Sequence, residues 1–237
     1  MKIKDQNKFS DFMSDLAIQH SMNSVFSDFL TLCICAFSLG RMEEKYLSVI
    51  SGYSKPEAEK FSSALAQLVM EMTGEGYGMV DVLGEFYENN LSHGKNGQFF
   101  TPQNICDLMA QILYSPKPGS HIADPACGSG RMLLSMAKLN RNALYYGADI
   151  DQNCAKMATL NLCLNHIFGE IAWMDSLSNK FYSGWSIEPT IKGLPRIREI
   201  TEKESFIHLK LPGGSSEGEK GKKLIELPLQ KQLVFEM

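Results

Sequence analysis

The chain has no surplus of positive charge, no long uninterrupted apolar run and no clustered cysteines. Its 23 lysines and arginines are outnumbered by 27 aspartates and glutamates, which gives a formal net charge of −4. A protein that binds nucleic acid by itself usually presents a basic face, because neutralising phosphates supplies most of the affinity. We therefore expect any contact with nucleic acid to depend on a local patch or on a partner.

The six cysteines occur without a Cys-x-x-Cys pair and without a histidine at metal-ligand spacing. They predict buried, reduced side chains and no metal site. The apolar run of residues 25–39 is interrupted by Asp28 and is shorter than the roughly 20 residues that a membrane span needs. The first residues show no basic segment followed by an apolar stretch and a cleavage site. These features predict a cytoplasmic protein with no membrane contact.

The apolar pattern predicts three regions. Residues 1–95 carry apolar side chains at helical spacing and predict a helical N-terminal region. Residues 96–211 alternate strand-like and helix-like segments and predict an α/β core. Residues 212–223 are rich in glycine, serine and lysine, which is typical of a flexible linker, and a short hydrophobic tail follows up to residue 237.

Within the α/β core, strands are expected at residues 121–124, 144–149 and 167–174. Helices are expected at residues 105–114, 131–140 and 153–165. Strands that alternate with helices of this length pair in parallel through right-handed crossovers. Later in the chain the pattern weakens: residues 205–211 fit one more strand, whereas residues 176–192 are mixed and polar and predict none.

A glycine-rich turn follows the first strand, which ends at Asp124, and precedes a helix. Gly128 and Gly130 allow backbone conformations and close approaches that a Cβ would block. The following helix begins with unpaired N–H groups and the positive end of its dipole. This arrangement is typical of a nucleotide-binding site, although similar turns also occur as plain tight turns.

Two further carboxylates end the next two strands. Asp149 stands 19 residues after Gly130, a spacing suited to binding both hydroxyls of a ribose. Asp175 is placed to accept a hydrogen bond from an adenine amino group at the same sheet edge. Structural roles are the alternatives: Asp149 could cap the next helix, for which Asp151 is better placed, and Asp175 could cap a turn.

Five short motifs occur in order between residues 81 and 177. They are Asp81-Val-Leu-Gly-Glu-Phe-Tyr-Glu88, Gly97-Gln-Phe-Phe-Thr-Pro102, Asp124-Pro-Ala-Cys-Gly-Ser-Gly130, Gly147-Ala-Asp-Ile-Asp151 and Asn161-Leu162. Together they resemble the adenine-N6 DNA methyltransferase family, and in particular the modification subunit of type I restriction–modification systems. The resemblance covers some two-fifths of the chain. The helical N-terminal part is also similar to that subunit's helical domain, without a motif to anchor it.

The resemblance implies a class I S-adenosylmethionine-dependent methyltransferase fold, Rossmann-like and shortened here, after an α-helical N-terminal region. It implies that residues 99–102 lie over the methionine part of S-adenosylmethionine, and that one of Phe99 and Phe100 belongs to the core. Asp149 would bind the ribose, Ile150 would pack on the adenine and Asp175 would bind its amino group. The implied cofactor-binding residues are Phe100, Thr101, Asp124, Ala126, Gly128, Gly130, Asp149, Ile150 and Asp175.

The family's methyl-transfer motif, Asn-Pro-Pro followed by Phe or Tyr, is absent from the sequence. In the family this motif binds the target amine through hydrogen bonds, while its aromatic ring stacks on the flipped base. The nearest segment, Glu188-Pro189, has a longer side chain, one proline and no aromatic residue after it. We assign no catalytic residue, and we expect a cofactor-binding homologue that does not methylate DNA alone or acts only in a complex.

Partners follow from the same resemblance. DNA is expected to bind through a partner subunit, such as a specificity subunit, or through a second copy of the chain. The alternative function is a non-enzymatic DNA-transaction or interaction protein that uses the fold as a scaffold. Its basis is the tail, where Gln230, Leu233 and Phe235 resemble the peptide that docks bacterial replication and repair proteins on the sliding clamp. An edge strand or a disordered tail are the other interpretations.

Overall fold

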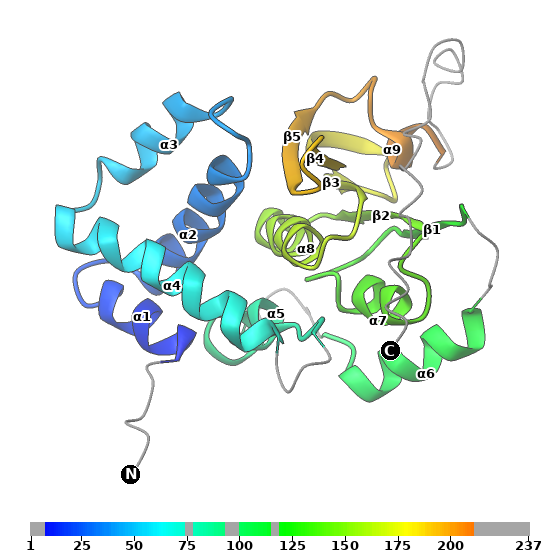
Figure 1. The fold of residues 1–237 in the computed structure, drawn as a ribbon, viewed down its shortest axis with the longest axis horizontal. Coiled ribbons are helices and arrows are strands. Elements are labelled where there is room, and N and C mark those ends of the chain that lie inside the picture. Colours follow the sequence, from blue (N-terminus) through cyan, green and yellow to red (C-terminus); the bar gives the residue numbers. More distant parts are fainter. Residues whose placement is uncertain (1–7, 74–77, 93–99, 115–118, 211–237) are drawn as a thin grey trace, which may run out of the picture.

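The structure is a computed structural model that describes residues 8–73, 78–92, 100–114 and 119–210. A helical region and an α/β region lie side by side in it (Figure 1). The helical region contains α1 (Phe9–Leu16), α2 (Met22–Ala36), α3 (Glu43–Ile50), α4 (Lys55–Thr73) and α5 (Val82–Tyr87), which continues as a π-helix, η1 (Glu88–Ser92). No helix of the described chain is long and apolar enough to cross a membrane.

Aromatic packing holds the helical region together. Phe9 of α1 lies 5.1 Å from Phe29 of α2 and 5.3 Å from Phe86 of α5, measured between ring centroids. Phe26 of α2 packs on the same Phe86 ring at 5.2 Å. Tilted and edge-on ring pairs at these distances stabilise a core beyond the area that they bury. The expected helical N-terminal region is therefore confirmed.

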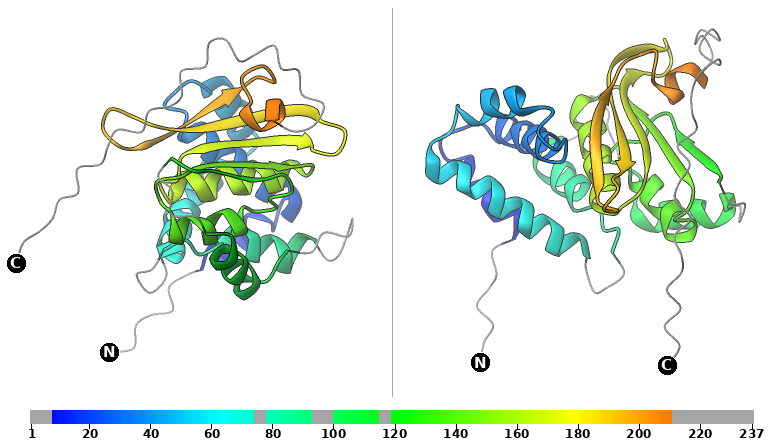
Figure 2. Two further views of the ribbon diagram at one scale, coloured as in Figure 1. Left: turned by 90° about the vertical axis from the view of Figure 1, so that its right-hand side faces the viewer. Right: turned by 45° about the horizontal axis from the view of Figure 1, so that its top comes forward.

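The α/β region is built on one five-stranded sheet with the order β1-β2-β3-β4-β5. Strands β1 (His121–Asp124), β2 (Leu144–Asp149) and β3 (Gly169–Asp175) are parallel, whereas β4 (Lys180–Pro189) and β5 (Pro195–Ile200) extend the sheet as an antiparallel hairpin. Helices α7 (Arg131–Leu139) and α8 (Gln152–Leu164) connect the parallel strands. Figure 2 shows the layers, with the helical region beyond α8. The predicted α/β fold after a helical region is confirmed.

Two predictions about the later part of the chain were wrong. Residues 206–210, which were expected to belong to a strand, form helix α9 (Phe206–Lys210). The N-terminus of this helix is capped by a side chain distant in the sequence. The Glu170 carboxylate of β3 accepts hydrogen bonds from the Ser205 hydroxyl (2.5 Å) and from the Phe206 N–H (2.9 Å). Residues 180–189, expected to form no strand, are β4, whose Trp185 and Ile187 are buried against Ile197 of β5.

Helix α6 (Gln103–Leu113) lies outside α7, on the side of the domain away from the helical region (Figure 1). It contacts α7 through buried Cys106 and Ala110 and through a polar network. In that network Gln103 Nε2 donates to Asp107 Oδ1 (2.9 Å) and to Ser135 Oγ (2.9 Å). Helix α6 thus directs its polar residues inward toward α7.

Candidate functional site

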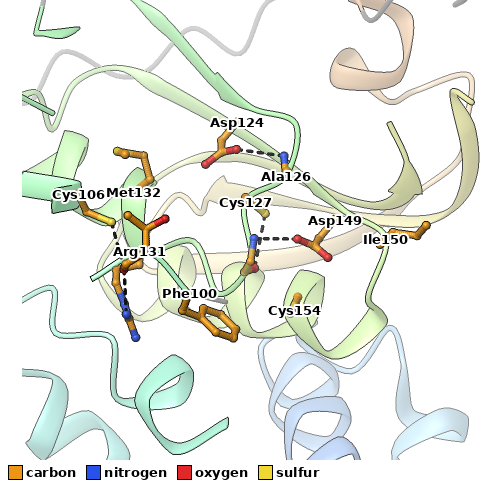
Figure 3. A pocket seen from close by; sticks show the side chains of 12 residues that line it. Phe100, Cys106, Asp124, Ala126, Cys127, Arg131, Met132, Asp149, Ile150 and Cys154 are labelled. Carbon is orange, nitrogen blue, oxygen red and sulfur yellow. Dashed lines mark hydrogen bonds between the residues drawn. The ribbon is translucent and has the colours of Figure 1, made fainter. Parts of the chain in front are cut away.

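A pocket lies at the carboxyl ends of β1 and β2, where the glycine-rich turn leads into α7 (Figure 3). Its volume is about 250 Å³, just below the roughly 300 Å³ at which small-molecule sites begin. Open α/β sheets bind ligands at this edge. The residues that line it are Phe100, Thr101, Cys106, Asp124, Ala126, Cys127, Gly128, Arg131, Met132, Asp149, Ile150 and Cys154.

Two glycines shape the turn in different ways. Gly128 has a φ of 54°, and a Cβ there would lie 3.2 Å from the Phe100 ring, so glycine lets this ring pack against the turn. Gly130 has a φ of 84° and precedes α7, and a Cβ there would lie 3.2 Å from the Cβ of Ala158 in α8. Gly128 therefore admits an aromatic wall of the pocket, whereas Gly130 allows the start of α7 to pack closely on α8.

Asp124 and Asp149 bring two carboxylates to the pocket, with Cys127 between them (Figure 3). Asp124 accepts from the Ala126 N–H (3.0 Å), and Asp149 accepts from the backbone N–H groups of Gly128 and Asp151 (both 2.8 Å). Burial raises the pKa of both carboxyl groups above the usual value, although these backbone hydrogen bonds oppose the shift. The pocket thus holds desolvated negative charge that a cationic ligand would stabilise.

The Asp81 carboxylate connects the helical region to the turn. Its Oδ1 accepts from the Gly84 N–H (2.9 Å), capping α5, and from Asn161 Nδ2 of α8 (2.8 Å). Its Oδ2 accepts from Ser129 Oγ (2.5 Å) and Arg131 Nε (2.9 Å). Asp81 is 1% exposed, so a buried charge is satisfied by four donors from three parts of the chain.

Arg131 connects this carboxylate to the segment over the turn. Its Nη1 donates to the Thr101 carbonyl (3.0 Å), and its Cζ lies 5.7 Å from the centroid of the Phe100 ring. Burial alone would lower the pKa of Arg131, but Asp81 and Glu88 raise it. The guanidinium therefore stays charged and fixes residues 100–101 beside the glycine-rich turn.

The structure brings together most of the predicted site residues. Those in the pocket lining are Phe100, Thr101, Asp124, Ala126, Gly128, Asp149 and Ile150. Gly130 instead packs behind the turn, and Phe99 lies outside the described residues. Asp151, and not Asp149, caps α8 by accepting from the Asn153 and Cys154 N–H groups (2.8 and 3.0 Å).

Asp175 does not join the pocket lining. Its Oδ2 accepts from Ser178 Oγ (2.6 Å), and its Oδ1 accepts from the Ser178 and Leu177 N–H groups (3.3 and 3.0 Å). The hydrogen bonds from Ser178 and Leu177 lower the pKa of this exposed carboxyl group. Asp175 therefore stabilises the turn after β3, which is the structural alternative that its sequence position had left open.

Sequence reasoning missed several lining residues. Arg131 directly follows Gly130, and this position was the available signal, because the first residue of the helix after such a turn faces the ligand end. Cys127 and Cys154 carried no signal beyond their general tendency to be buried. Burial raises the pKa of both thiols, so they remain neutral and form an apolar wall.

Glu188 and Pro189, the segment nearest to a transfer motif, lie far from the pocket along the sheet. Because β4 runs antiparallel to β3, Ile187 pairs with Gly169 at the start of β3, while the pocket lies beyond the strand ends. Glu188 is paired with Arg196 and with Arg198 (2.9 Å) of β5. The Glu188 carboxylate therefore stabilises the β4–β5 hairpin and does not reach the pocket.

Comparisons with known proteins agree with this geometry. The family described as N-6 DNA Methylase matches residues 78–190, which include Asp81 and the pocket residues. The type I restriction enzyme MpnII methylase subunit of Mycoplasma pneumoniae is 29% identical over 151 residues, 54% of this chain and 28% of that protein. The MjaVIII methylase subunit of Methanocaldococcus jannaschii is 35% identical over 131 residues, 51% of this chain and 22% of that protein.

The chain spans about a quarter of the length of these relatives. Among solved structures, the methyltransferase subunit of a type I restriction-modification system from Streptococcus thermophilus is 19% identical and covers 67% of this chain and 36% of its own, with a TM-score of 0.35. Residues 78–190 of this chain thus match the N-6 DNA Methylase family, and about half of the chain is similar in sequence to the methylase subunits of type I restriction enzymes.

Proposed function

We propose that the pocket binds S-adenosylmethionine. The observation that carries this proposal is the pair of desolvated carboxylates, Asp124 and Asp149, at the ends of adjacent parallel strands on either side of a glycine-rich turn. S-adenosylmethionine carries a sulfonium and an ammonium group, and both positive charges suit such a pocket. The methylase relatives supply an independent reason for the same ligand class.

The residues fit distinct parts of this ligand. Each Asp149 oxygen accepts one backbone N–H and keeps a second lone pair, so the carboxylate can bind the two ribose hydroxyls. Exposed Ile150 offers an apolar surface for the adenine. Asp124, Ala126 and Gly128 would surround the methionine part beneath residues 100–101. Asp175 is not included, because its carboxylate is engaged by its own turn.

Isothermal titration calorimetry with S-adenosylmethionine and its demethylated product tests the pocket. Asp149→Ala should weaken binding about ten- to a hundredfold, the range for losing hydrogen bonds to a charged group. Asp175→Ala is the matched control, a strand-end aspartate outside the pocket, and should leave the dissociation constant unchanged. Absence of binding by the natural chain at millimolar ligand would reject the proposal.

We also propose that this chain does not transfer a methyl group to DNA by itself. The supporting observations are the absence of Asn-Pro-Pro and the place of Glu188 at the far end of the hairpin. Incubation with unmethylated DNA and methyl-labelled cofactor should leave adenine unlabelled. Label on adenine with this chain alone would show that another part of it performs the transfer.

DNA contact is proposed to come through a partner subunit, such as a specificity subunit, or through self-association. The net charge of −4 supports this, because an isolated acidic chain gains little from phosphate contacts. The alternative function, docking on a sliding clamp through Gln230, Leu233 and Phe235, falls on residues outside the described part of the chain. Equal clamp pull-down before and after deletion of residues 230–237 would remove that alternative.

A further inference from the structure

Tyr87 of α5 connects the helical region to the pocket, although it does not belong to the pocket lining. Helix α5 lies where the helical region meets the α/β region (Figure 1). Tyr87 is 7% exposed, and the centroid of its ring lies 5.9 Å from that of Phe26 in α2. The core of the helical region therefore fixes the position of this ring.

The same ring contacts the aromatic wall of the pocket. The centroids of Tyr87 and Phe100 are 6.0 Å apart, and the two ring planes form an angle of 73°. Such edge-on pairs stabilise a structure beyond the area that they bury. Phe100 also lies against the glycine-rich turn, since a Cβ on Gly128 would be 3.2 Å from its ring. Tyr87 and the turn thus both fix the position of Phe100.

The hydroxyl group of Tyr87 contacts the segment after β2. It donates to Asp151 Oδ2 at 3.4 Å, and the backbone N–H of Asp151 donates to Asp149 Oδ1 (2.8 Å). Burial and the charge of Asp151 raise the pKa of Tyr87, so the hydroxyl keeps its proton. A hydrogen bond of this length is weak, and we therefore expect the ring of Tyr87 to matter more than its hydroxyl.

Two side chains hold the segment that lies over the turn. Arg131 reaches it from the α/β region and donates to the Thr101 carbonyl (3.0 Å). Tyr87 reaches it from the helical region and packs on the Phe100 ring. The place of this ring therefore depends on how the helical region packs on the α/β region.

We propose that Tyr87 is a positioning residue for cofactor binding, and that its ring sets the place of Phe100 over the methionine part of the ligand. This inference rests on the proposed function, in which S-adenosylmethionine occupies the pocket with its methionine part beneath residues 100–101. Ligand affinity then depends on the docking of the helical region, through Phe26, Tyr87 and Phe100 in series. Because such coupling is reciprocal, the ligand also stabilises this docking.

Calorimetry with two ligands separates this role from a general loss of stability. S-adenosylhomocysteine and 5′-methylthioadenosine are both thioethers of adenosine, and only the first carries the amino-acid part. Tyr87→Leu should weaken binding of S-adenosylhomocysteine by about tenfold and that of 5′-methylthioadenosine by less than about threefold, because only the first ligand extends beneath Phe100. Tyr87→Phe keeps the ring and should change both dissociation constants by less than about threefold.

Phe29→Leu is the matched control, an aromatic-to-leucine change in the same helical core. The Phe29 ring pairs with Phe9 (5.1 Å) and with Phe61 (6.5 Å). This variant should lower stability and leave the ratio of the two dissociation constants unchanged. Equal weakening of both ligands by Tyr87→Leu would overturn the proposal, and so would the same change of ratio in Phe29→Leu. A natural chain that binds neither ligand would reject the proposed function, and this proposal with it.

Hydrogen exchange in the natural chain tests the same coupling without a substitution. At equal saturation, S-adenosylhomocysteine should slow exchange at residues 82–87 of α5 at least about threefold more than 5′-methylthioadenosine does. Equal protection of α5 by the two ligands would also overturn the proposal.

Discussion

The two halves of the sheet handle charge in opposite ways. In the parallel half, Asp124 and Asp149 face a pocket, and burial raises the pKa of both. In the antiparallel hairpin, burial acts on Glu188 in the same direction, but Ser186, Arg196 and Arg198 outweigh it and lower its pKa. The parallel half has desolvated carboxylates at its strand ends, whereas the carboxylate of the hairpin is paired with arginines of the hairpin itself.

This difference indicates where a ligand is needed. Charge that the protein pairs internally contributes to the fold, and charge that it leaves desolvated at a cavity costs stability unless a ligand compensates. Lys156 of α8 is a different case: it lies outside the pocket lining, is 6% exposed and donates to Thr31 Oγ1 of α2 (3.0 Å), whereas Asp124 and Asp149 share one cavity. Perturbed groups that gather around one cavity are a sign of function.

The largest expected effect is at Asp81. Asp81→Ala removes the acceptor for Arg131 and leaves a buried guanidinium without its main partner, which typically costs about 3–5 kcal/mol. Urea unfolding should show this loss of stability, and calorimetry should show weaker ligand binding because residues 100–101 lose their anchor. Asp15→Ala is the control at an exposed aspartate of α1, whose ion pair with Lys60 (3.2 Å) is open to solvent; it should cost at most about 1 kcal/mol and leave ligand binding unchanged. Equal stability of Asp81→Ala and the natural chain would contradict the proposed role of this carboxylate.

The next effect is at Lys156, where burial and the nearby Lys45 lower the pKa to about 8. The unfolded chain, with a pKa of about 10.4, binds more protons between these two values, so stability should rise as pH increases from about 8 to 10.4. Lys156→Met should stabilise the protein at pH 7 by about 1–3 kcal/mol and flatten this rise. Thermal unfolding at a series of pH values measures both changes, and an unaltered slope in the variant would assign the pH dependence elsewhere.

Glu188→Gln should lower stability by about 1–2 kcal/mol, because it weakens a part-buried pair with Arg196 and Arg198. It should leave the dissociation constant for S-adenosylmethionine unchanged. The same isosteric change in the parallel half, Asp149→Asn, should mainly weaken the binding of S-adenosylmethionine and should change stability less. If Glu188→Gln weakened ligand binding as much as Asp149→Asn, the contrast between the two halves would be lost.

The smallest effect concerns pH and the pocket. A cationic ligand requires ionised Asp124 and Asp149, and their raised pKa values mean that protonation begins above the usual value of about 3.9. Affinity should therefore fall as pH decreases from 7 to about 4, beginning above the pH at which an ordinary aspartate is protonated, and Asp149→Asn should show a weaker dependence. Calorimetry over this range, with circular dichroism to verify folding, measures the effect. Constant affinity over the whole range would argue against carboxylate recognition of the ligand.

The strands nearest the pocket could be predicted from sequence. β1 and β2 begin and end at the expected residues, because each is a short strand-like run that ends in an aspartate. β4 could not be predicted, since its first half is polar and its burial depends on pairing with β3 and β5. α9 depends on Glu170, 35 residues away from Ser205.

The same division holds for the site. Residues at the ends of successive strands, such as Asp149, follow from the α/β pattern, because parallel strands end at one edge. The role of Asp81 could not be predicted, since its partners Ser129, Arg131 and Asn161 meet it only when the helical region packs on the turn. Asp175 shows the converse: its position in the pattern is right, but local hydrogen bonds occupy its carboxylate.

Hydrogen exchange with and without S-adenosylmethionine tests the central claim most directly, because it reports on both halves of the sheet in one experiment. We expect slower exchange on ligand addition at residues 124–131 and 149–154, and no change at residues 180–200 of the hairpin. Protection of the hairpin without protection of the glycine-rich turn would contradict the central claim.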